Sequence, residues 1–145
     1  MLKANIIYHT RTGNTKSLAE KIKKRLEDLN IEVGIYQDNK FKTLDSLNDI
    51  DIICLGTPTH YFQIAKEFKE FLKKIERFNF KAKKLIVFAT GVSPKSHPKI
   101  CNDIIKILKP TGIETIAKIG CVKEPTDELD SKIKQVISKD LFRYI

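Results

Sequence analysis

The sequence has no apolar run that approaches the ~20 residues needed to span a membrane. Its first residues also lack the pattern of a secretory signal peptide. The three cysteines, Cys54, Cys101 and Cys121, are widely spaced and form no C-x-x-C pair, which argues against a disulfide framework and a zinc site. We therefore expect a cytoplasmic protein with no membrane insertion. Cys54 and Cys121 lie in apolar, strand-like runs, so we expect both to be buried structural thiols.

Length and composition indicate one globular domain. The 145 residues are enough for a single core and too few for two. Hydrophobic residues make up 41% and charged residues 31%, as is typical of globular chains. We therefore expect a single domain over residues 1–145 and a monomer.

Basic residues are in excess and are unevenly distributed. The formal net charge is +9, and between Lys66 and Lys84 eight basic residues stand against three acidic ones, a net charge of +5. Such a run is either a solvated helix face or a patch that steers acidic partners or nucleic acid. We expect an acidic protein partner and not nucleic acid.

Apolar runs alternate with amphipathic stretches along the whole chain. Residue patterns predict strands over 4–8, 31–36, 50–55, 85–89 and 115–122, and helices over 15–29, 64–75, 98–108 and 125–139. The polar segment 37–48 has room for one helical turn around Leu44 and Leu47. This alternation predicts an α/β fold with a doubly wound, five-stranded parallel sheet, strand order 2-1-3-4-5 and helices on both faces. In that order, ligands bind beyond the carboxyl ends of strands one and three.

The turn after the first predicted strand is rich in hydrogen-bond donors. It consists of Thr10, Arg11, Thr12, Gly13, Asn14 and Thr15. A strand-to-helix turn of this kind aims backbone N–H groups and the positive end of the helix dipole at one point, which suits a phosphate. The alternative is an ordinary capped helix start, because Thr and Asn are common caps.

Two further loops are expected at the same edge of the sheet. The loop after the third strand contains Thr57, Pro58, Thr59, His60 and Tyr61, and the loop after the fourth contains Thr90, Gly91, Val92 and Ser93. No glycine lies between Thr57 and Phe62, so a positive φ in that segment would cost about 1 kcal/mol or more.

These loops resemble those of the flavodoxin family. Residues 8–15, Tyr-His-Thr-Arg-Thr-Gly-Asn-Thr, resemble its FMN-phosphate loop, and residues 56–61 resemble its second flavin loop. The resemblance implies that FMN lies with its phosphate against residues 10–15 and its isoalloxazine between residues 57–61 and 90–93, with Tyr61 stacking on the ring. The sequence departs from the family at 89–96, which lacks the aromatic residue often found there, and in its basic charge.

Other families that share such a fold carry motifs that this sequence lacks. A phosphoacceptor receiver needs an aspartate where Leu55 and Gly56 stand, and a P-loop of the form G-x-x-x-x-G-K-[ST] is absent. A cysteine phosphatase needs a Cys and an Arg in one phosphate loop, which no cysteine here has. His60 is interpreted as a polar loop residue and His97 as a surface or cap-region residue, and we assign no catalytic residue and no metal ligand.

Three functions remain open. The favoured one is an FMN electron carrier that exchanges electrons with redox partner proteins and has no substrate chemistry of its own. The second is an FMN-dependent oxidoreductase that reduces a small substrate such as a quinone or a porphyrin precursor. The third is a flavin-free basic module that binds nucleic acid or an acidic protein.

Overall fold

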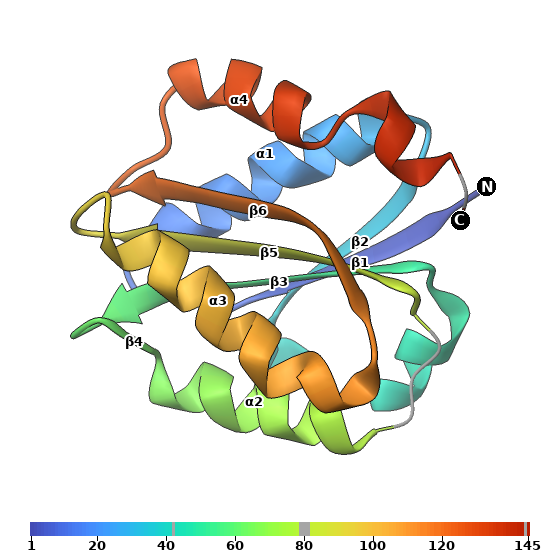
Figure 1. Cartoon of the computed structure of the whole chain (residues 1–145), viewed down its shortest axis with the longest axis horizontal. Helices are drawn as coiled ribbons and strands as arrows, with labels where there is room; N and C mark the ends of the chain where they lie inside the picture. The colour runs from blue at the N-terminus through green and yellow to red at the C-terminus, as the bar shows by residue number, and fades with distance from the viewer. Residues whose placement is uncertain (42, 79–81, 144) are drawn as a thin grey trace.

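The computed structural model describes residues 1–41, 43–78, 82–143 and 145 (Figure 1). Its strands are β1 (Lys3–Tyr8), β2 (Glu32–Gln37), β3 (Ile52–His60), β4 (Gln63–Ile64), β5 (Lys84–Gly91) and β6 (Glu114–Val122). Its α-helices are α1 (Asn14–Asp28), α2 (Lys66–Arg77), α3 (Ser96–Leu108) and α4 (Glu128–Val136). Four short 3-10 helices complete the description: η1 (Asp38–Lys40), η2 (Leu44–Asp49), η3 (Lys109–Thr111) and η4 (Lys139–Phe142). No helix of these residues is long and apolar enough to cross a membrane.

The sheet confirms the predicted fold class and strand order. Five parallel strands lie in the order β2-β1-β3-β5-β6, which is the predicted 2-1-3-4-5 when only the long strands are numbered. The prediction of five strands misses a sixth, because the two-residue β4 pairs antiparallel with the end of β3.

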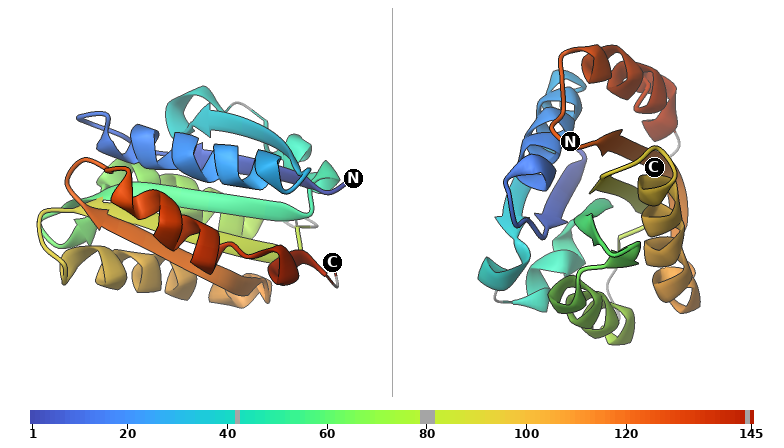
Figure 2. Two further views of the ribbon diagram at one scale, coloured as in Figure 1. Left: turned by 90° about the horizontal axis from the view of Figure 1, so that it is seen from above. Right: turned by 90° about the vertical axis from the view of Figure 1, so that its left-hand side faces the viewer.

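Helices cover both faces of the sheet, so the central strands are buried on both sides. Helices α1 and α4 lie on one face and α2 and α3 on the other (Figure 2). Successive residues of β3 point to opposite cores: Leu55 belongs to the core that contains Phe68 of α2, whereas Cys54 belongs to the core that contains Leu18 of α1. This double burial explains why the sequence shows continuous apolar runs in its strands.

The observed ends of several helices and strands differ from the predicted ends by a few residues. Ile64 belongs to β4 and not to the following helix, α3 begins at Ser96 before Pro98, and the last predicted helix divides into α4 and η4. The polar segment 37–48 contains two 3-10 helices where one helical turn was expected. Cys54 and Cys101 are buried, but Cys121 is half-buried near the end of β6, so the prediction for Cys121 is wrong.

Residues 57–60, predicted as part of a loop, belong to a strand, and Tyr61 alone of the predicted loop 57–61 lies in a turn. Strand β3 continues to His60, and residues 59 and 60 pair with Ile64 and Gln63 across a two-residue turn. The turn residues Tyr61 and Phe62 have φ of 50° and 60°, the left-handed values that a two-residue hairpin needs at both positions. The absence of glycine thus does not prevent a positive φ here, because strand pairing and burial of Ile64 offset the local cost.

Strand β5 likewise extends beyond its predicted end and includes Thr90 and Gly91. Pro58 pairs with Thr90 in the parallel ladder between β3 and β5. The ring of Phe88 in β5 covers Gly56 of β3 so closely that a Cβ on Gly56 would overlap the ring.

Candidate functional site

The three predicted loop regions meet at the carboxyl edge of the sheet. Tyr8 lies opposite Gly56, and Pro58 lies opposite Thr90, so the ends of β1, β3 and β5 are neighbours. The His9 N–H donates to the carbonyl of Gly56 at 3.0 Å, which holds the turn after β1 against β3. Helix α1 begins at this point, on the opposite side of β1 from α2 (Figure 2).

The amino end of α1 carries no side-chain cap. Gly13 is the N-cap residue with φ of 95°, and its own N–H donates to Thr10 Oγ1 at 3.1 Å. No side chain accepts a hydrogen bond as a cap, and the first turn contains no acidic residue. The first-turn N–H groups therefore remain available to an anion, and the helix dipole favours negative charge there.

The threonines of the site divide into open and buried groups. Thr12 is exposed and Thr10 is half-exposed. Thr15 and Thr90 are buried, and their hydroxyl oxygens lie 2.9 Å apart, which ties α1 to β5. The Thr59 hydroxyl donates to the carbonyl of Thr90 at 2.9 Å, so it joins the hairpin to the same strand.

Charged side chains link the first turn to the hairpin. Arg11 Nη1 lies 2.8 Å from His60 Nδ1, and Arg11 Nη2 lies 3.8 Å from a Glu67 carboxylate oxygen. His9 lies between two carboxylates, with Nδ1 2.9 Å from Asp38 and Nε2 3.8 Å from Glu67. A hydrogen bond from backbone N–H at the start of α2, together with His9, Arg11 and His60, lowers the pKa of Glu67.

The sequence did not point to Asp38 as part of this edge, and it placed His9 there only as a member of residues 8–15, with no role of its own. Both follow the ends of adjacent parallel strands, β1 and β2, and that position is the signal that could have found them. The Asp38 side chain is only 6% exposed and that of His9 14%, so this pair is the best protected of the charged contacts here.

Apolar side chains border the polar edge. Tyr61 is 86% exposed, Phe62 54% and Val92 70%. The Tyr61 ring packs edge-on against His60, with centroids 4.6 Å apart. Aromatic and aliphatic surface thus lies beside the hydrogen-bond donors of the first turn, as a planar ring with a charged tail would require.

The segment after β5 is held by Ser96, which the sequence analysis did not single out. Ser96 is buried and donates through Oγ to the carbonyl of Ser93 at 2.9 Å. Its Oγ occupies the space that a Cβ on Gly91 would need. His97 lies in the first turn of α3, in the cap region that the sequence allowed, and it is half-buried against Gly120 and not on the surface. Burial, followed by the nearby Lys132, lowers the pKa of His97.

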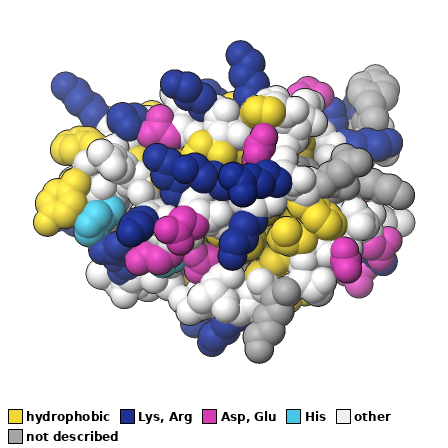
Figure 3. Space-filling model, turned by 90° about the horizontal axis from the view of Figure 1, so that it is seen from below, with side chains coloured by type: hydrophobic (Ala, Val, Ile, Leu, Met, Phe, Trp, Pro, Cys, Tyr) yellow, Lys and Arg dark blue, Asp and Glu magenta, His cyan; other side chains and the backbone are white. Residues whose placement is uncertain are grey.

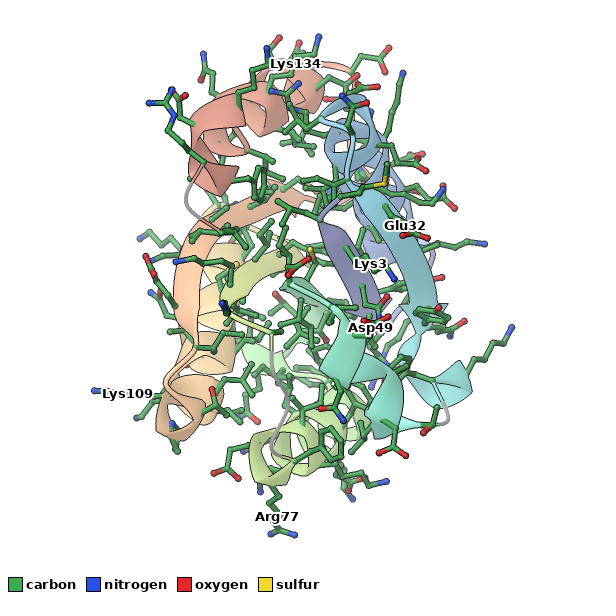
Figure 4. The ribbon with its side chains drawn as sticks, turned by 90° about the vertical axis from the view of Figure 1, so that its right-hand side faces the viewer. Lys3, Glu32, Asp49, Arg77, Lys109 and Lys134 are labelled. Atoms are coloured by element: carbon green, nitrogen blue, oxygen red, sulfur yellow. The ribbon has the colours of Figure 1, made fainter. Side chains whose placement is uncertain are left out.

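The basic run 66–84 does not form one surface. Lys66 to Arg77 lie along α2, whereas Lys84 lies at the amino edge of the sheet, where it pairs with Glu114; Lys81 is outside the described residues. Figure 4 views that opposite edge, where Lys3 reaches Asp49 at 3.1 Å and Asp49 raises the pKa of Lys3. Within the described ranges, no three His, Cys, Asp or Glu side chains gather as metal ligands.

An uncapped helix start beside an apolar border, at the switch point of a doubly wound sheet, is typical of folds that bind a nucleotide-like phosphate ester. A family model described as flavodoxin domain matches residues 5–126. The chain belongs to the flavodoxin family. Flavodoxins bind FMN, and FMN is the cofactor, as the resemblance implied.

Similar proteins agree with this assignment. A flavodoxin of Buchnera aphidicola is 26% identical over 122 residues, covering 81% of this chain and 70% of the relative. A flavodoxin of Clostridium saccharobutylicum is 32% identical over 97 residues, covering 63% of this chain and 58% of the relative. The matches to the curated relatives thus span well short of their full length, between 58% and 70% for these two.

Solved structures share the fold at low sequence identity. A flavodoxin from the domain Archaea superposes with a TM-score of 0.84 at 22% identity, covering 97% of this chain and 99% of that one. Oxidised flavodoxin 1 from Bacillus cereus gives 0.83 at 20% identity, covering 99% of each chain. At this identity the likeness establishes the fold alone.

Proposed function

We propose that this chain is a one-domain FMN electron carrier that passes electrons between redox partner proteins. The observation that carries the proposal is the amino end of α1, where Gly13 leaves the first-turn N–H groups without a side-chain cap or an acidic neighbour. Bound FMN would supply reversible electron chemistry, which the side chains around the site do not offer by themselves.

The residues present fit the two parts of FMN differently. The first-turn N–H groups, Thr10, Thr12 and Arg11 would hold the phosphate, while Asn14 begins α1 and Thr15 supports the helix through Thr90. The isoalloxazine would lie between residues 57–61 and residues 90–93, with Tyr61 against the ring. Val92, 70% exposed, offers apolar surface on the side where an aromatic residue is lacking.

The setting of this function is also proposed. The whole of residues 1–145 would work as a single domain and as a monomer in the cytoplasm. Its partners would be redox proteins that are acidic at the docking surface, because the chain carries a formal net charge of +9.

Flavin binding, followed by visible absorption, is the direct test of this proposal. The purified protein is stripped of ligand, titrated with FMN and with riboflavin, and followed by its visible spectrum and by quenching of flavin fluorescence. We expect tight binding of FMN and much weaker binding of riboflavin, because only FMN carries the anion that the α1 terminus suits. Equal binding of the two flavins, or none, would overturn the proposed phosphate site.

The other two functions have their own readouts. An FMN-dependent oxidoreductase would turn over a quinone or a porphyrin precursor with saturation kinetics, whereas a carrier would react with it only in a simple second-order step. The specific observation that favours a flavin-free module is the excess of lysine on α2. Failure to bind FMN, with an intact fold, would select that function.

A further inference from the structure

A groove runs between α2 and α3 on the face of the sheet away from α1. Its volume is about 350 Å³, and Ile64 and Ile107 form an apolar part of its lining. Lysines from both helices border it: Lys69 from α2, and Lys99 and Lys106 from α3.

The charges at this groove are not balanced. Its only acidic lining residue, Asp103, lies 2.7 Å from Lys99 and is paired with it. Lys69 and Lys106 are exposed, and neither has an ion-pair partner among the described residues. The groove therefore presents two unneutralised ammonium groups across an apolar floor, one on each wall.

The outer surface of α2 extends the positive charge. Lys66, Lys69, Lys73 and Arg77 are spaced three or four residues apart, so they share one side of the helix, and all four are exposed. Figure 3 shows this face, where dark blue side chains cross the middle and acidic side chains lie in small groups beside them.

One end of the groove reaches the candidate site. Gln63 and Ile64, which line the groove, form β4, and β4 is the second strand of the hairpin that begins with residues 59 and 60. A partner seated between α2 and α3 would thus lie beside the hairpin, close to the proposed flavin. Electron transfer weakens steeply with distance, so this closeness favours the groove over remote basic surfaces.

A second groove, between α1 and α4, gives a matched comparison. It is of similar size, about 320 Å³, and it includes Lys24 and Lys134. Three aspartates line it, however, and Lys21 is bonded to Asp130 at 2.7 Å. Carboxylates of the chain itself already occupy much of that positive surface, which leaves less for an acidic partner.

We propose that the α2–α3 groove is the docking surface for an acidic protein partner, which places carboxylates against Lys69 and Lys106 and apolar side chains over Ile64 and Ile107. The choice of a redox protein as partner rests on the proposed electron-carrier function; the surface itself does not. The apolar floor and the acidic Glu70 and Asp103 on this face suit a protein better than a continuous phosphate backbone.

The test uses a fluorescein-labelled deca-glutamate peptide as the probe, with binding followed by anisotropy at ~20 mM and ~300 mM NaCl. The variant is Lys69→Glu/Lys106→Glu. The matched control is Lys24→Glu/Lys134→Glu, which changes the net charge equally but in the α1–α4 groove. FMN titration and circular dichroism of all three proteins check the fold and the flavin site separately.

We expect the wild-type affinity for the peptide to fall with salt, the α2–α3 variant to bind roughly tenfold more weakly at low salt, and the control to lose less than about threefold. Equal weakening of both variants, or no binding by the wild type, would overturn the proposal. Tighter binding of a labelled ten-residue oligothymidylate at the same lysines would also overturn it, in favour of nucleic acid. If the peptide result holds while FMN fails to bind, the docking surface stands and the electron-carrier function does not.

Discussion

Replacing Tyr61 with glycine should make the protein more stable. Tyr61 is 86% exposed and has φ of 50°. A residue with a Cβ costs about 1–2 kcal/mol in the left-handed region. Glycine removes that cost but loses about 0.5–1 kcal/mol more conformational entropy on folding. Because the tyrosine ring buries little surface apart from its contact with His60, Tyr61→Gly should gain about 0.5–1 kcal/mol.

Thermal and urea unfolding of the flavin-free protein measure this change. For a chain of this size the gain corresponds to a rise in Tm of about 2–3 °C. The control is Tyr61→Ala, which removes the ring and keeps the Cβ, and which should be no more stable than the wild type. If the glycine and alanine variants have equal stability, or if alanine is the more stable, the turn is unstrained and the reasoning fails. Loss of the ring should weaken FMN and riboflavin alike, because stacking acts on the part that the two flavins share.

Three further predictions concern single side chains. Thr12→Ala should weaken FMN roughly tenfold, or by about 1–2 kcal/mol, and leave riboflavin unchanged; parallel fluorescence titrations decide this. Gly13→Ala should cost about 1 kcal/mol or more in urea unfolding. The new Cβ would meet no atom within 4 Å, so that cost comes from φ of 95° alone, and a neutral result would contradict it. Lys21→Ala should raise the pKa of Asp130, which the Lys21 hydrogen bond lowers, and an NMR titration would show an unchanged pKa if that pair does not form in solution. Because the pKa of Asp130 is lowered in the folded state, its contribution to stability is present above the ordinary pKa and is lost as pH falls.

Continuous apolar runs were enough to predict the sheet. Successive residues such as Cys54 and Leu55 point to opposite helical layers, so every position is apolar, as is typical of a parallel sheet covered on both faces. The end of β3 was harder to predict. Gly56 and Pro58 are typical of turns, yet here Gly56 makes room for the ring of Phe88, and Pro58 pairs in the ladder with β5. These two causes lie in residues far along the chain, so a local pattern does not contain them.

The position of the candidate site followed from strand order, but the roles of its residues did not. Thr12 and Thr15 look alike in the sequence, and only the structure shows Thr12 exposed and Thr15 bonded to Thr90. In the same way, the spacing of lysines on α2 is readable from the sequence, whereas the groove needs Lys106, thirty-seven positions beyond Lys69, to be placed across from it. Contacts between distant segments decide both cases.

The packing of Phe88 onto Gly56 has a consequence for how such a chain can change over generations. Because a Cβ on Gly56 would overlap the ring of Phe88, a larger residue cannot replace Gly56 unless residue 88 also changes. A lineage that gained alanine at 56 would first need a smaller side chain at 88, and that intermediate would carry a cavity costing roughly 3–5 kcal/mol for a change from phenylalanine to alanine. The two residues are therefore expected to be inherited as a pair, and their joint retention would mark descendants that keep this edge of the sheet closed.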